Sequence, residues 1–214
     1  GLPSPHTSSM VGREGEVAQL HRFAHPLKEG RHAGIVFIYG EAGIGKSRLT
    51  YELKKILTAD GHIGWHICQA DQILRKPFNP FVYFLKNYFE QTPEAHSAGN
   101  VNRFEQRFQE LVNAVRQVET PEAEAAAKEL VRTKSVLAAL IGINFEGSLW
   151  EQLDARGRYE NTLQAVINLT EAGSLIEPVV IELEDAHWLD ENSQELLQEL
   201  IRHLRDFPIL LVIT

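Results

Sequence analysis

The stretch Gly40-Glu41-Ala42-Gly43-Ile44-Gly45-Lys46-Ser47 follows the apolar run Ile35-Val36-Phe37-Ile38-Tyr39, and together these residues decide the fold. The apolar run is partly β-branched, which predicts a strand covered on both faces in a parallel sheet. After the glycines, Leu49, Leu53, Ile56 and Leu57 recur at helical spacing until Asp60-Gly61, and a second strand is predicted at Trp65–Gln69. A strand, a glycine turn, a helix and a strand form a βαβ unit, so the predicted fold class is α/β with a parallel sheet.

The remaining sequence predicts two more strands and a long helical segment. A helix is predicted at Glu14–Leu27, after a flexible arm at residues 1–10. Helical periodicity then dominates up to the third strand, so we expect a helical insertion at about residues 78–172 within a domain of residues 11–214. The other predicted elements are a helix at 101–118, an alanine-rich helix at 121–130 capped by Thr120, a helix around 163–167, a strand that begins with residues 178–181, a helix at 193–205 and a strand at 209–213.

Composition narrows the classes of function. The chain has 214 residues and a formal net charge of -8, which argues against nucleic acid as a general partner of this segment. The single cysteine, Cys68, cannot form an internal disulfide, which favours a reducing compartment. No apolar run approaches the roughly 20 residues of a membrane-spanning helix, and the N-terminal residues lack the apolar core of a signal peptide. We therefore expect a cytoplasmic protein without a membrane partner.

Residues 40–47 fit the phosphate-loop pattern G-x-x-x-x-G-K-S, placed between a strand and a helix as that pattern requires. Glycines allow consecutive backbone N–H groups to surround an anion, and the helix N-terminus adds partial positive charge. Lys46 is expected to contact the β- and γ-phosphates, and the Ser47 hydroxyl to bind Mg²⁺. The predicted phosphate contacts are Gly40, Glu41, Ala42, Gly43, Ile44, Gly45, Lys46, Ser47 and Arg48.

A second motif is acidic and ends the strand that begins with residues 178–181. Glu184 and Asp185 end this strand, in the manner of a Walker B motif beside the phosphate loop. We assign Glu184 to the metal and Asp185 to the attacking water. The usual order is Asp then Glu, so the shorter side chain stands at the base position and slow hydrolysis is expected. Glu182 lies inside the same strand, where a buried carboxylate needs a partner, and the sequence does not identify that partner.

Three segments together resemble a known family. Residues 10–14 (Met-Val-Gly-Arg-Glu), 40–49 and 184–190 (Glu-Asp-Ala-His-Trp-Leu-Asp) resemble the AAA-type ATPase domain of signalling proteins of the STAND class. That domain occurs in large bacterial transcriptional regulators and beside class III adenylate or guanylate cyclase domains. The resemblance implies a three-layer αβα P-loop NTPase fold that binds ATP or ADP with Mg²⁺.

The resemblance also implies roles for residues outside the phosphate loop. Val11, Gly12 and Arg13 would lie near the adenine. The expected preference of the site for adenine over guanine rests on the resemblance alone. His187 would either sense the γ-phosphate or pack against the acidic loop, and packing is favoured. Trp188 is interpreted as a core residue, whereas Asp190 is expected to cap the following helix.

One departure from the family concerns the end of the sequence. Family members have a fifth strand beside the first, followed by a sensor arginine, whereas this sequence stops at Thr214 after the fourth strand. We therefore expect the N-terminal part of a longer regulator, with downstream domains of the same chain as partners and the first strand left as an exposed edge. A nucleotide-dependent oligomer is a further alternative for its partners. The favoured function is a regulatory switch with ATPase activity; the alternatives are nucleotide binding without turnover, a DNA-associated AAA-type ATPase, and a P-loop kinase.

Overall fold

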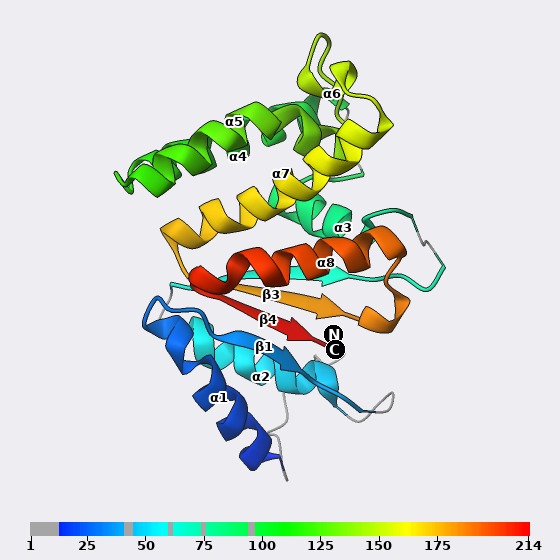
Figure 1. Ribbon diagram of the computed structural model, residues 1–214. Helices are drawn as coiled ribbons and strands as arrows, with labels where there is room; N and C mark the ends of the chain where they lie inside the picture. The colour runs from blue at the N-terminus through cyan, green and yellow to red at the C-terminus, as the bar shows by residue number, and fades with distance from the viewer. Residues whose placement is uncertain (1–12, 41–44, 60–61, 74–75, 94–96) are drawn as a thin grey trace.

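A parallel sheet forms the centre of the computed structural model, which describes residues 13–40, 45–59, 62–73, 76–93 and 97–214. The described strands are β1 (Gly34–Phe37), β2 (Gly64–Gln69), β3 (Val179–Glu184) and β4 (Ile209–Ile213). Their order across the sheet is β1-β4-β3-β2, and every neighbouring pair is parallel. All strands therefore end at one edge of the sheet (Figure 1). The predicted α/β fold class with a parallel sheet is confirmed.

Helices cover both faces of this sheet, because most of the strand residues that point to either face are apolar. On one face, Val180, Leu210 and Val212 are buried against α1 (Glu14–Lys28) and α2 (Lys46–Thr58). On the other face, the alternate residues of the same strands pack with the remaining helices, including α8 (Glu191–His203). The result is a three-layer αβα arrangement of the P-loop NTPase type.

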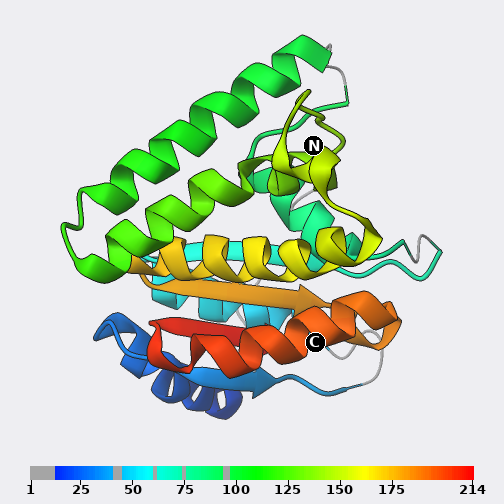
Figure 2. The ribbon, with the colours of Figure 1, turned by 45° about the horizontal axis from the view of Figure 1, so that its top comes forward.

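The chain between β2 and β3 is helical, as the sequence indicates. It contains α3 (Asn79–Tyr88), α4 (Ser97–Arg116), α5 (Pro121–Leu140), α6 (Leu149–Gln152) and α7 (Ala155–Ile176). Helix α7 lies on the sheet, and Figure 2 shows α4 and α5 on the side of α7 that faces away from the strands. Helix α5 is twice as long as predicted, because buried side chains continue through Val136–Ala138.

The first strand differs from its prediction. It begins at Gly34 and ends at Phe37, instead of Ile35–Tyr39, and it is not covered on both faces, since the side chain of Phe37 is 51% exposed and that of Tyr39 is 85% exposed. The reason is that β1 lies at the edge of the sheet, where it pairs only with β4 and loses its partner once β4 ends. The exposed edge was expected. Strand β4 lies between β1 and the acidic strand β3.

Two helix caps agree with their predictions. The Thr120 hydroxyl accepts a hydrogen bond from Ala123 N at the start of α5, and the Asp190 carboxylate accepts one from Ser193 N at the start of α8. Helix α8 begins two residues before its prediction, directly after this cap. Five side chains from β2, α3 and the residues next to α3 are buried in the core, namely Cys68, Phe78, Phe81, Phe84 and Phe89.

Candidate functional site

The turn from β1 into α2 has the backbone that an anion site requires. Gly45 precedes α2 with φ 92° and ψ 25°, a left-handed conformation that glycine adopts without strain. Helix α2 begins at Lys46 and carries no acidic residue in its first turn. The amides of Arg48 and Leu49 donate to Gly45 O. The N–H groups at the start of an α-helix have no carbonyl acceptor within the helix itself. The start of α2 is therefore suited to negative charge.

The lysine of the phosphate loop bends back over the turn. Lys46 Nζ donates a hydrogen bond to Gly40 O at 2.6 Å, which joins the first residue of α2 to the segment that follows β1. The predicted contacts between these two residues, Glu41 to Ile44, lie outside the described residues. Ser47 follows Lys46 in the first turn of α2, and the guanidinium of Arg48 lies 3.9 Å from the carboxylate of Glu52.

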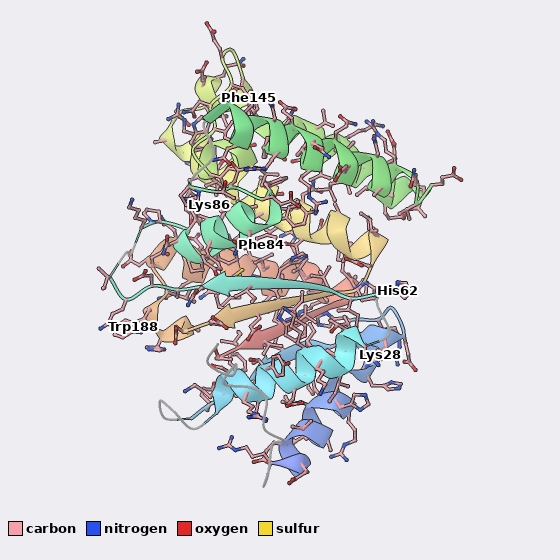
Figure 3. The ribbon with its side chains drawn as sticks, turned by 180° about the vertical axis from the view of Figure 1, so that it is seen from behind. Lys28, His62, Phe84, Lys86, Phe145 and Trp188 are labelled. Atoms are coloured by element: carbon pink, nitrogen blue, oxygen red, sulfur yellow. The ribbon has the colours of Figure 1, made fainter. Side chains whose placement is uncertain are left out.

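A cavity of about 970 Å³ opens at the carboxyl ends of the strands and joins the two predicted motifs. Lys46 and Asp185 both line it, because β1 and β3 are parallel and end at the same edge. Figure 3 shows Trp188 at this edge, while Lys28 and His62 mark the opposite one. The described lining residues are Phe37, Ile38, Tyr39, Gly40, Gly45, Lys46, Ser47, Arg48, Asp185, Ala186, His187, Ile213 and Thr214.

Asp185 reaches the cavity from a constrained backbone. Its φ of 55° and ψ of 43° place it in the left-handed region, which costs roughly 1–3 kcal/mol for a residue other than glycine. Two hydrogen bonds hold this conformation, from Ala186 N to Thr214 O and from Trp188 N to Asp185 O, both at 2.9 Å. The end of β4 thus fixes the start of the acidic loop, and the carboxylate of Asp185 is exposed to solvent.

Glu184 and its neighbour Asp185 differ in their exposure and in their relation to the cavity. Glu184 is the last residue of β3 and is half-buried, and it is not among the described residues that line the cavity. Burial raises the pKa of its carboxyl group, and the nearby carboxylates of Glu182 and Asp185 raise this pKa further. A bound cation would offset this repulsion, so the metal role assigned to Glu184 stays a prediction that the local charges favour.

The buried carboxylate of Glu182 has a partner that the sequence did not identify. Glu182 is 4% exposed, and its Oε2 accepts a hydrogen bond from Trp65 Nε1 at 2.7 Å. Trp65 belongs to β2, and Lys54 Nζ of α2 lies 5.8 Å from the centre of its ring. The two hydrogen-bonded residues are 117 positions apart, so only the pairing of β2 with β3 brings them together.

The residues implied by the family resemblance are only partly described. Val11 and Gly12 lie outside the described residues. Arg13 directly precedes α1, where its carbonyl oxygen accepts from Val17 N, and it does not belong to the described lining of the cavity. His187 lines the cavity and is exposed, with its ring 4.7 Å from that of Trp188.

Trp188 does not lie in the buried core, which corrects its interpretation. It is partly buried and lines a second cavity of about 460 Å³, because the short 3-10 helix η1 (Ala186–Trp188) directs it toward the end of β2. Asp185 lines both cavities, and Asn79 and Lys86 of α3 line the opposite wall of the second one. No local sequence pattern indicates this second cavity, because its walls come from segments that are distant along the chain.

The fold and the cavity are those of a P-loop NTPase-type domain, and comparison with known proteins specifies its family. A sequence profile described as the AAA ATPase domain matches residues 9–213, so the chain belongs to the AAA ATPase domain family. The chain is also similar to an uncharacterized protein of Rhizobium meliloti (strain 1021), with 29% identity over 96% of this chain. The match spans 18% of the length of that relative.

Family membership indicates nucleotide binding together with Mg²⁺, and ATPase-type activity in general. In the part of the chain that the structure describes, no helix is both long enough and apolar enough to cross a membrane.

Proposed function

We propose that this chain is an ATP-binding, slowly ATP-hydrolysing switch module of a longer signal-transduction protein. The observation that carries the proposal is the single cavity that Lys46 and Asp185 share at the start of α2. Its volume of about 970 Å³ is sufficient for a nucleoside triphosphate, since ligand pockets span roughly 300–1,000 Å³. The family membership and the similarity to a segment of a much longer protein support the proposal.

The proposed roles follow from the chemistry of the lining residues. The first amides of α2 and the ammonium of Lys46 bind the β- and γ-phosphates, and the Gly40 carbonyl orients the lysine before nucleotide arrives. The Ser47 hydroxyl and the carboxylate of Glu184 hold Mg²⁺, which takes hard oxygen ligands. The metal supplies neutralisation of phosphate charge. Asp185 accepts a proton from the attacking water and orients it.

Isothermal titration tests the binding part of the proposal. Lys46→Ala is expected to lose most of the binding heat of Mg-ATP and Mg-ADP, while GTP binds weakly to both proteins. The matched control is Lys55→Ala, since Lys55 is an exposed cation of the same helix and lines a different cavity. Equal heats for the wild type and Lys46→Ala would refute the site. The proposed role in signal transduction is tested in the full-length protein. The sequence of the whole gene identifies the adjoining domains, and the activity of those domains is then compared between the wild type and Lys46→Ala.

Nucleotide binding without turnover is the second candidate. The observation that favours it is the exposed, short carboxylate of Asp185 at the position of the base. Phosphate release by the wild type and by Asp185→Asn separates the two functions. A switch that hydrolyses ATP loses phosphate release in Asp185→Asn and keeps nucleotide binding, whereas a binding module releases equally little phosphate in both forms.

A further inference from the structure

The loop that carries Asp185 is held at its far end as well as at its start. The acidic loop, residues 185–190, begins directly after β3 and ends directly before α8. Its start is tied to β4 through Ala186 N and Thr214 O. Its last residue is Asp190, whose carboxylate makes three hydrogen bonds to described residues. The position of Asp185 therefore depends on both ends of the loop.

Asp190 does more than cap a helix. Its Oδ1 accepts from Ser193 N at 2.9 Å and its Oδ2 accepts from Ser193 Oγ at 2.5 Å, and these two bonds form the cap of α8. Oδ1 also accepts from Phe78 N at 3.2 Å, a residue 112 positions away. A cap needs only the bonds to Ser193. The bond to Phe78 joins the acidic loop to the segment that leads from β2 into α3.

Phe78 is itself a constrained residue. Its φ of 61° places it in the left-handed region, although it carries a large side chain that is 7% exposed. Such a conformation persists only where the surroundings hold it. Its ring lies 5.8 Å from that of Tyr159 of α7, and its N–H bonds to Asp190. The hydrogen bond from Asp190 thus helps to set the direction in which α3 begins.

The acidic loop and α3 also face each other across the second cavity. Asp185 and Trp188 line it on one side, and Asn79 and Val82 line it on the other. Asp185 simultaneously lines the nucleotide cavity. Asp185 and the first turn of α3 therefore border the same cavity. Asp190 lies in the same loop as Asp185, and it accepts a hydrogen bond from Phe78 N, directly before the first residue of α3.

We propose that Asp190 is a positioning residue: through its hydrogen bond to the Phe78 N–H it fixes the carboxylate of Asp185 at the nucleotide cavity and couples α3 to the state of that cavity. The inference rests on the proposed function, since it concerns the same site. It adds a route by which the binding of nucleotide affects the helices between β2 and β3.

Steady-state kinetics test the positioning role. Asp190→Ser keeps a capping hydroxyl but is too short to reach Phe78 as well, and we expect kcat to fall about 10- to 100-fold with KM within twofold, the scale of a misplaced catalytic group. Asp190→Asn keeps Oδ1 and is expected to restore kcat to within twofold of the wild type. The matched control is Asp154→Ser, because Asp154 caps α7 through Gly157 N. Equal kcat values for Asp190→Ser and Asp154→Ser would overturn the proposal.

Hydrogen exchange tests the coupling without requiring turnover. Wild-type protein is compared with and without a non-hydrolysable ATP analogue and Mg²⁺. Exchange is expected to slow both at Lys46–Thr50 and in α3, and in Asp190→Ser to slow only at Lys46–Thr50. A wild-type protein that responds at Lys46–Thr50 but not in α3 overturns this inference and leaves the proposed function intact. Absence of a response at both segments overturns the proposed function itself.

Discussion

Removing the indole N–H of Trp65 isolates a buried charge inside the sheet. Glu182 is 4% exposed and lies in β3, between β2 and β4, so its carboxylate is well shielded from water. Trp65 Nε1 donates to it at 2.7 Å. Trp65→Phe keeps an aromatic ring against α2 but deletes the donor. The substitution therefore tests the hydrogen bond with little change in apolar packing.

The expected cost follows from two known effects. A hydrogen bond to a charged group contributes about 1.5–3 kcal/mol, and breaking a buried ion pair costs about 3–5 kcal/mol. Trp65 is only partly buried, so some water reaches the vacated position and the lower range applies. We expect Trp65→Phe to lower the free energy of unfolding by about 2–3 kcal/mol, which corresponds to a fall in Tm of roughly 4–12 °C for a chain of this length.

A double-mutant cycle identifies the cause. Unfolding in urea is measured for the wild type, Trp65→Phe, Glu182→Leu and the double variant. Since Glu182→Leu removes the charge, Trp65→Phe should cost less than about 1 kcal/mol in that background, which gives a coupling of about 1–3 kcal/mol. If Trp65→Phe costs the same in both backgrounds, the hydrogen bond to Glu182 is not what stabilises this part of the sheet.

Three further predictions concern titratable groups. Burial lowers the pKa of His66 to about 4, so the unfolded chain binds its proton more tightly and stability should fall by at most about 3 kcal/mol as the pH falls from 6.5 to 4; urea unfolding at several pH values measures this loss. The raised pKa of Glu184 means that its ionisation destabilises the folded chain, so Glu184→Gln should raise Tm at neutral pH without nucleotide. Burial raises the pKa of the Cys68 thiol, so the folded protein should resist thiol reagents until it is denatured.

Each of these predictions has a result that contradicts it. The loss of stability in acid should shrink in His66→Phe, which keeps the contacts with the rings of Phe84 and Tyr88; an unchanged acid profile would assign the loss to other groups. A lower Tm for Glu184→Gln would show that Glu184 has a stabilising partner in the folded state. Rapid labelling of Cys68 at neutral pH would mean that β2 opens readily.

Much of the fold could be predicted because its signals are local. Gly45 takes a left-handed conformation at the start of α2, and Thr120 caps α5 within three residues of itself. Apolar residues at helical spacing predicted α4 and α8 closely. The places of Lys46 at the start of α2 and of Glu184 at the end of β3 could be predicted, because motif and secondary structure agree over short stretches of chain.

The errors and omissions have a common origin in long-range pairing. The position of β4 between β1 and β3 depends on which strands exchange hydrogen bonds, and no local pattern specifies that order. The exposure of Phe37 and Tyr39 follows from the place of β1 at the sheet edge. Trp188 was interpreted as core from its residue type, whereas the turn of η1 directs it to a second cavity.

The amino-acid sequence by itself determined the phosphate loop, the acidic pair, the parallel α/β class and the helix caps, because each depends on residues within a turn or two of one another. Only the tertiary structure decided that Lys46 and Asp185 line one cavity, whereas Glu184 does not line it. It also decided that Trp65 donates a hydrogen bond to Glu182 and that Asp190 accepts one from Phe78 N. These contacts require particular strand order and register, which arise from burial of the whole core and not from any single segment.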